Sequence, residues 1–175
     1  PLCLGAFYMS GLRELRYAAL LHDFGKVGVR EQVLVKAKKL YPPDLAFIRH
    51  RHAFIRRTAE REFWRQRTEL LEAHGKKGYE GFVKTLEEAH GMEVQELDRF
   101  LEIVLKANEP SILPEGSFEE LQAWGSRSYL GGDGATEPFL TTDEVRYLTI
   151  RKGSLDDSER LEIESHVTHT FEFLQ

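Results

Sequence analysis

The middle of the chain is a long, heavily charged stretch with only a thin apolar stripe, and this pattern predicts helices. The first predicted helix runs over 55–74 and stops at a turn that Gly75 and Gly78 mark. A second helix is predicted over 79–90 and a third over 94–107, where apolar residues recur at helical spacing. We therefore expect an antiparallel helical hairpin that is stabilised against itself or against a partner subunit.

Short polar residues mark helix starts in the part of the chain that follows. Ser117 is expected to cap one short helix and Thr142 another, because their hydroxyls can accept hydrogen bonds from free backbone N–H groups. Between them, 126–138 holds a cluster of glycines and is predicted to be a flexible loop. Ser154 or Asp156 is expected to cap the last helix.

Composition limits the class of protein. With 175 residues, 41% of them hydrophobic, the chain is long enough to bury a core, so one domain with an elaboration is expected. A formal net charge of −5 argues against a general binder of nucleic acid polymers. The single Cys3 excludes an internal disulfide framework and a cysteine-based zinc site. No apolar run approaches the roughly 20 residues of a membrane span, so a cytoplasmic protein is expected.

A histidine and an aspartate follow each other at the predicted end of a helix over 12–21. His22 and Asp23 fall in its last turn, Gly25 is a plausible C-terminal stop, and Lys26 lies just beyond. Imidazole and carboxylate groups are ligands for first-row metals, and a nearby lysine can meet a phosphate that such a metal polarises. A His-Asp pair alone is common by chance and is usually structural.

The longer stretch 22–29, His-Asp-Phe-Gly-Lys-Val-Gly-Val, resembles the signature of the HD-superfamily phosphohydrolases. More narrowly, it is similar to the HD-GYP branch, whose members are cyclic di-GMP phosphodiesterases. The segment 150–167 resembles that family's unit of Lys-x-Gly-x-Leu, acidic cap, helix and histidine, and places His166 at the position of a metal ligand. The resemblance covers both ends of the chain and not its middle.

The resemblance implies metal-assisted hydrolysis of a phosphodiester. Asp23 would bridge two divalent ions, while His22 ligates one ion and His166 the other; Fe, Mn and Zn all suit this ligand set. Lys26 would neutralise charge that grows on the phosphate oxygens. The family pattern assigns no role to His169, which is either a plain surface histidine or a residue that supports the metal site.

The expected substrate is a cyclic dinucleotide, and Lys26 and Arg30 are its candidate contacts. Arg30 could hold the second phosphate, as could Lys36, Arg151 and Lys152, although such residues are more often solvated charges. Lys26 could instead be an ordinary lysine at a helix end that satisfies terminal carbonyls.

A weak internal repeat offers a clue to how the middle segment arose. Laying Leu40 over Leu155 brings Arg51 over His166. We interpret the first copy as decayed, with arginine at the ligand position, and separated from the working copy by an insertion. The alternative is that two short helices share a cap and an apolar pattern by chance.

The resulting prediction is an all-α fold, an HD-type helical bundle with an inserted helical hairpin arm. Residues 1–52 and 141–175 are expected to form the two parts of the bundle, and 53–140 the arm and a flexible loop. The chain starts at Pro1 and stops within a helical pattern at Gln175, which suggests a piece of a longer protein. Because the family's remaining ligands lie outside it, we expect this piece to bind metal weakly and to hydrolyse cyclic di-GMP poorly.

Two other functions stay open at this point. One is a broader HD-type nucleotide phosphohydrolase with the same chemistry and different substrates. The other is a non-catalytic signalling module that forms a homodimer through the helical arm.

Overall fold

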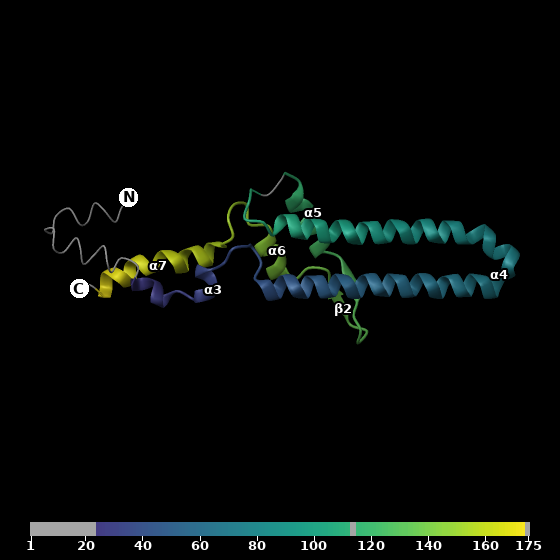
Figure 1. Cartoon of the computed structure of the whole chain (residues 1–175), viewed down its shortest axis with the longest axis horizontal. Coiled ribbons are helices and arrows are strands. Elements are labelled where there is room, and N and C mark those ends of the chain that lie inside the picture. Colours follow the sequence, from purple (N-terminus) through teal and green to yellow (C-terminus); the bar gives the residue numbers. More distant parts are fainter. Residues whose placement is uncertain (1–23, 113–114, 174–175) are drawn as a thin grey trace. The chain divides into compact units, whose positions relative to one another are not determined.

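The computed structural model describes residues 24–112 and 115–173, and most of them are helical (Figure 1). The elements in chain order are the 3-10 helix η1 (Phe24–Gly28), α3 (Glu31–Leu34), α4 (Pro42–Ala107), α5 (Ser117–Gly125), β1 (Ser128–Leu130), β2 (Thr136–Pro138), α6 (Thr142–Leu148) and α7 (Asp157–Phe173). The prediction of an all-α fold is confirmed, since one two-stranded sheet is the only β structure in the described residues. Among these helices, none combines the length and the apolar character that crossing a bilayer requires.

The chain divides into two compact units. The described parts of the first are 24–37 and 155–173, so segments from the two ends of the chain fold together. The second unit is 38–154. The expected boundaries differ from these, because residues 38–52 and 141–154 belong with the arm and not with the ends. The physical reason is that α4 runs without interruption from Pro42 into the arm, while α6 packs on α4 and α5.

The long helix α4 is a helical hairpin (Figure 1). Its backbone leaves the helical conformation at Gly75, where φ is 61° and ψ is −177°, and the two halves run antiparallel on either side of this residue. The predicted hairpin and its turn are therefore confirmed. The predicted interruption between 90 and 94 is wrong, since the helix continues through Gly91. A glycine inside a helix costs only about 0.5–1 kcal/mol relative to alanine, which packing between the halves can offset.

Contacts between the two halves hold the hairpin together. The rings of Phe63 and His90 stack with their centroids 4.5 Å apart. Closer to the open end, the buried His52 lies with Nε2 3.1 Å from the carbonyl oxygen of Leu97. The sequence left open whether the hairpin is stabilised against itself or against a partner subunit. These contacts show that its two halves pack against each other.

An aromatic cluster forms the core of the second unit. Phe100 from α4 lies 4.7 Å from Trp124 of α5 and 5.7 Å from Phe139, measured between ring centroids. All three side chains are buried. The guanidinium of Arg127 covers the Trp124 ring at 4.1 Å, which closes the cluster with a cation–π contact. These contacts bring α5 and the segment after β2 onto the open end of the hairpin.

The predicted flexible loop over 126–138 is in part a β-hairpin. Strands β1 and β2 pair antiparallel, with Ser128 opposite Pro138 and Leu130 opposite Thr136. Gly134 lies in the connecting turn with φ of 83°, a backbone conformation that glycine adopts without strain.

The helix caps lie close to the predicted positions. Thr141, one residue before the predicted Thr142, caps α6 and exchanges side-chain hydrogen bonds with Glu144 in a capping box. Asp156 accepts a hydrogen bond from the backbone N–H of Glu159 at 2.8 Å, so it is the cap of α7 among the two candidates. The cap predicted at Ser117 is wrong, because Gly116 occupies the N-cap position of α5.

Candidate functional site

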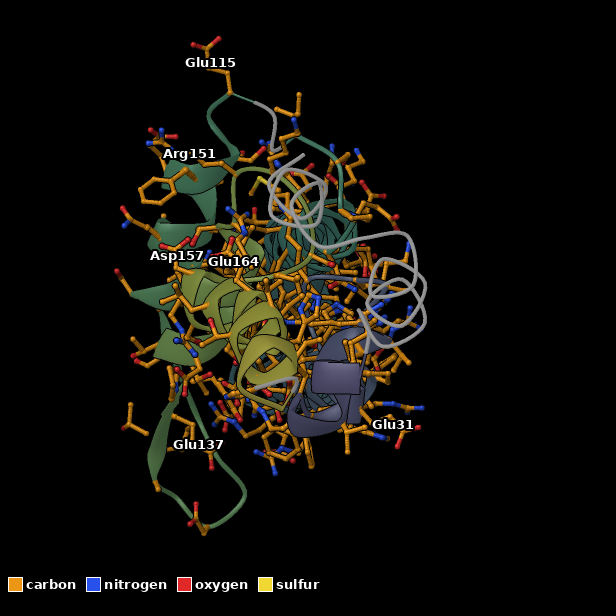
Figure 2. The ribbon with its side chains drawn as sticks, turned by 90° about the vertical axis from the view of Figure 1, so that its left-hand side faces the viewer. Glu31, Glu115, Glu137, Arg151, Asp157 and Glu164 are labelled. Carbon is orange, nitrogen blue, oxygen red and sulfur yellow. The ribbon has the colours of Figure 1, made fainter. Side chains whose placement is uncertain are left out.

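The candidate site belongs to the unit that the two chain ends form. His22 and Asp23 lie outside the described residues, and η1 begins at the next residue, Phe24. This short helix packs along α7, the helix that carries His166 (Figure 1). Figure 2 shows the same arrangement nearly along α7, with Glu31 on the neighbouring α3 and Glu164 on α7. The segment that follows the signature pair is therefore in contact with the helix of the predicted third ligand.

His166 is held in a defined orientation on α7. Its ring is half-buried, and Nδ1 makes a hydrogen bond with the carbonyl oxygen of Ile163. Because a carbonyl can only accept, this contact is a hydrogen bond in the tautomer that carries its proton on Nδ1, and in that tautomer Nε2 keeps a lone pair. Metal-binding histidines commonly have this pattern, in which one ring nitrogen donates to a backbone carbonyl and the other binds the ion.

His169 lies one helical turn further along and contacts η1. A Cβ atom built on Gly28 would lie 3.1 Å from Nδ1 of His169. This distance is tighter than most packed side chains have, so a larger residue at position 28 would require the exposed side chain of His169 to shift by a few tenths of an ångström. The second glycine of the signature thus lies at the contact between η1 and α7. The signature singled out Gly28 in the sequence, but it did not indicate that His169 would be its neighbour.

Lys26 lies in η1 and is half-buried. It shares this short helix with Gly28 and therefore lies on the element that packs against α7. Its position one turn after the signature pair is compatible with the predicted contact to phosphate.

Arg30 has a carboxylate partner in this structure. Its side-chain Nε lies 2.9 Å from Oε2 of Glu162, its Nη2 lies 2.6 Å from the same oxygen, and its backbone N–H donates to Oε1 at 2.8 Å. These hydrogen bonds hold the pKa of Glu162 below its usual value. Arg30 therefore joins the chain after η1 to α7, and a phosphate would have to compete with this bidentate contact.

The structure also places the other three basic residues that were candidates for binding the second phosphate. Lys36 forms an ion pair with Glu159, Nζ to Oε1 2.7 Å, and the two side chains are only 1% and 2% exposed. This burial removes Lys36 from any contact with a dissolved phosphate. Arg151 and Lys152 are exposed and belong to the other unit, 38–154. The acidic residues of α7 that engage Arg30 and Lys36 were missed, although their spacing of one helical turn marks a single helix face.

Arg51, the residue that the repeat lays over His166, has a structural role. Its Nη1 donates to Oε2 of Glu144 at 2.8 Å and to the carbonyl oxygen of Phe139 at 2.9 Å. The same register lays Pro42 over Asp157, the first residues of α4 and α7. The two segments therefore share a helix start, and the arginine copy is engaged in an ion pair.

Within the described residues, no group of three or more His, Cys, Asp and Glu side chains is arranged to hold a metal ion. Of the three predicted ligands, His166 is the one whose geometry is described, and its contact with the Ile163 carbonyl is compatible with the ligand role. Comparison with known families, with curated proteins and with solved structures finds no match to this chain. The residues and contacts described above are thus the basis for assigning a function.

Proposed function

We propose that this chain forms part of a metal-dependent phosphodiesterase similar to the HD-GYP enzymes, with cyclic di-GMP as substrate. One observation carries the proposal: η1, which directly follows His22 and Asp23 in sequence, packs against the helix that bears His166. The segment that continues from His22 and Asp23 and the helix of His166 are far apart in sequence and lie against each other. As part of this proposal, the protein acts in the cytoplasm, where its substrate is a soluble signalling nucleotide.

The residues of the chain have distinct roles in this proposal. His22, Asp23 and His166 would hold two divalent ions, Fe, Mn or Zn, and the ions would supply Lewis-acid activation of water and phosphate. The carbonyl of Ile163 would hold the ring of His166 in the tautomer that a ligand needs. Lys26 offers a positive charge to the phosphate oxygens, where negative charge develops during the displacement.

The test is metal binding and turnover by this protein. His166→Ala should lower the affinity for Mn²⁺ by more than about 100-fold, since losing a ligand exceeds the 10- to 100-fold cost of losing its supporting partner. Hydrolysis of cyclic di-GMP should fall with it. His50→Ala is the matched control, because His50 is an exposed histidine in the other unit. Equal metal affinity in both variants would refute the proposal.

The substrate class is tested separately. A panel of mononucleotides and cyclic dinucleotides, assayed with Mn²⁺ and with Fe²⁺, distinguishes a cyclic di-GMP phosphodiesterase from a broader nucleotide phosphohydrolase. If the protein prefers mononucleotides, the proposed metal site stands, but the proposal that cyclic di-GMP is the substrate is wrong.

A second candidate function is a signalling module that dimerises through the arm. The observation that favours it is exposed apolar surface on α4, where Trp64 is 58% and Phe82 52% exposed. Light scattering over a range of concentrations should then show a dimer, which Trp64→Ser combined with Phe82→Ser converts to a monomer. In this case Asp23→Ala would leave the cellular activity unchanged, whereas it abolishes the activity of an enzyme.

A further inference from the structure

A cleft of about 440 Å³ lies in the second unit, where the start of α4 meets α6. Its volume is within the range of roughly 300–1,000 Å³ that small-molecule sites occupy. Every residue that lines it belongs to the unit 38–154, whereas the predicted metal ligands belong to the chain ends. The cleft is thus built by residues that the proposed phosphodiesterase site does not use.

Aromatic rings form the walls of this cleft. Tyr41 and Tyr147 meet edge to face, with ring centroids 6.1 Å apart and planes at 86°. Phe47, one and a half turns into α4, also lines the cleft and is 64% exposed. A ligand that covered this ring would remove apolar surface from water. The guanidinium of Arg146 lies 4.7 Å from the Tyr147 centroid, so this ring already attracts a cation on one face.

The residues that line the cleft carry more negative than positive charge. The ion pair between Arg51 and Glu144 neutralises itself and is largely buried, with 16% and 9% of the two side chains exposed. Asp44 is half-buried, and no hydrogen bond or ion pair joins its side-chain carboxylate to any other residue in the described part of the chain. Asp143 also lines the cleft, although it is paired with an arginine at 3.2 Å. The cleft therefore has excess negative charge, and an anion such as a nucleotide phosphate is disfavoured.

Asp44 also lies in the first turn of α4. A carboxylate in the first turn of a helix interacts favourably with the helix dipole whether or not a ligand binds. Charge alone therefore does not define a site here. The combination of three aromatic rings, a cleft of ligand size and an unpaired carboxylate is more specific, because it matches the requirements of one class of ligand.

We propose that this cleft binds a small organic ammonium ion. The faces of aromatic rings attract ammonium groups, and quaternary ammonium ligands are commonly held in aromatic cages. Tyr41, Phe47 and Tyr147 would surround the cation, and Asp44 would balance its charge. The buried ion pair of Arg51 and Glu144 joins α4 to α6 within the lining of the cleft.

The decisive experiment compares choline with its uncharged isostere 3,3-dimethylbutan-1-ol. The two have nearly the same shape, so a difference in affinity reports the charge. Titration followed by NMR of the protein should give choline binding at least about tenfold tighter than the isostere, which corresponds to one cation–π contact and one ion pair. Equal affinity, or no saturable binding of choline, would overturn the proposal.

Two variants locate the binding. Phe47→Leu removes the exposed ring and Asp44→Asn removes the charge, and each should weaken choline binding by about tenfold. Glu80→Gln is the matched control for the charge change, because Glu80 is exposed on the distal part of α4 and does not line the cleft. Thermal unfolding checks that each variant is folded. If Phe47→Leu and Asp44→Asn bind choline as tightly as the Glu80→Gln control does, the ligand binds elsewhere and the assignment to this cleft is wrong.

Discussion

The ion pair of Lys36 and Glu159 provides a sharp test of how the two chain ends are held together. Both side chains are almost completely buried, and Nζ lies 2.7 Å from Oε1 and 2.8 Å from Oε2. Glu159 also accepts a hydrogen bond from the backbone N–H of Asp156 at 2.9 Å. Removing the lysine therefore takes the ion-pair partner away from a buried carboxylate.

The expected cost follows from this burial. Breaking a buried ion pair by removing one partner destabilises a protein by about 3–5 kcal/mol, because the other charge remains buried without compensation. Lys36→Met should therefore weaken the unit formed by 24–37 and 155–173 by this amount. The double variant Lys36→Met with Glu159→Leu should recover most of the loss, since replacing both charges with apolar groups is often neutral or stabilising.

Hydrogen exchange of the α7 amides is the suitable assay, because it reports on this unit separately from the arm. A loss of about 3–5 kcal/mol corresponds to protection factors lower by roughly 150- to 5,000-fold, or to full loss of protection. Lys38→Met is the control: Lys38 pairs with Glu109, but the two side chains are 47% and 50% exposed. Such a surface pair contributes at most about 1 kcal/mol. Equal effects of the Lys36 and Lys38 variants would refute the reasoning.

Three further predictions concern the arm and its core. Phe100→Ala should lower the free energy of unfolding by about 3–5 kcal/mol, since it removes a buried ring from the aromatic cluster; urea unfolding followed by the fluorescence of Trp124 measures this, and a loss below about 1 kcal/mol would contradict it. Gly75→Ala should cost about 1–3 kcal/mol, because its backbone conformation is nearly restricted to glycine. Gly81→Ala, in a helical position with open space around it, should instead stabilise the arm by up to about 1 kcal/mol, and thermal melts of the pair decide between these signs. Burial lowers the pKa of His52 despite a hydrogen bond to a backbone carbonyl and an aspartate 3.8 Å away. The folded arm therefore favours the neutral ring, so its stability should fall as pH drops from about 7.5 to about 5.5, and His52→Gln should flatten that dependence in thermal melts.

Several features of the fold were predictable because they depend on neighbouring residues. The helical hairpin follows from a periodic pattern and from a glycine at the turn, both of which act within a few residues. Thr141 and Asp156 cap their helices through bonds to residues three positions on, so short polar residues located these starts to within one position. Gly91 shows where prediction from neighbouring residues fails, because the helix continues through it. Its local preference against a helix is about 1 kcal/mol, and packing along the hairpin overrides it.

The sequence by itself determined the helical character of the chain, the turn of the arm and the candidate ligands, because these follow from local preference and residue chemistry. Only the tertiary structure decided the partners of the charged residues. Arg30 and Lys36 look like solvated charges, yet each meets a glutamate of α7 more than a hundred positions away. No local signal encodes such a pairing, because it depends on how the two chain ends pack. The same holds for the aromatic cleft, whose walls come from the start of α4 and from α6, which are far apart in sequence and adjacent in space.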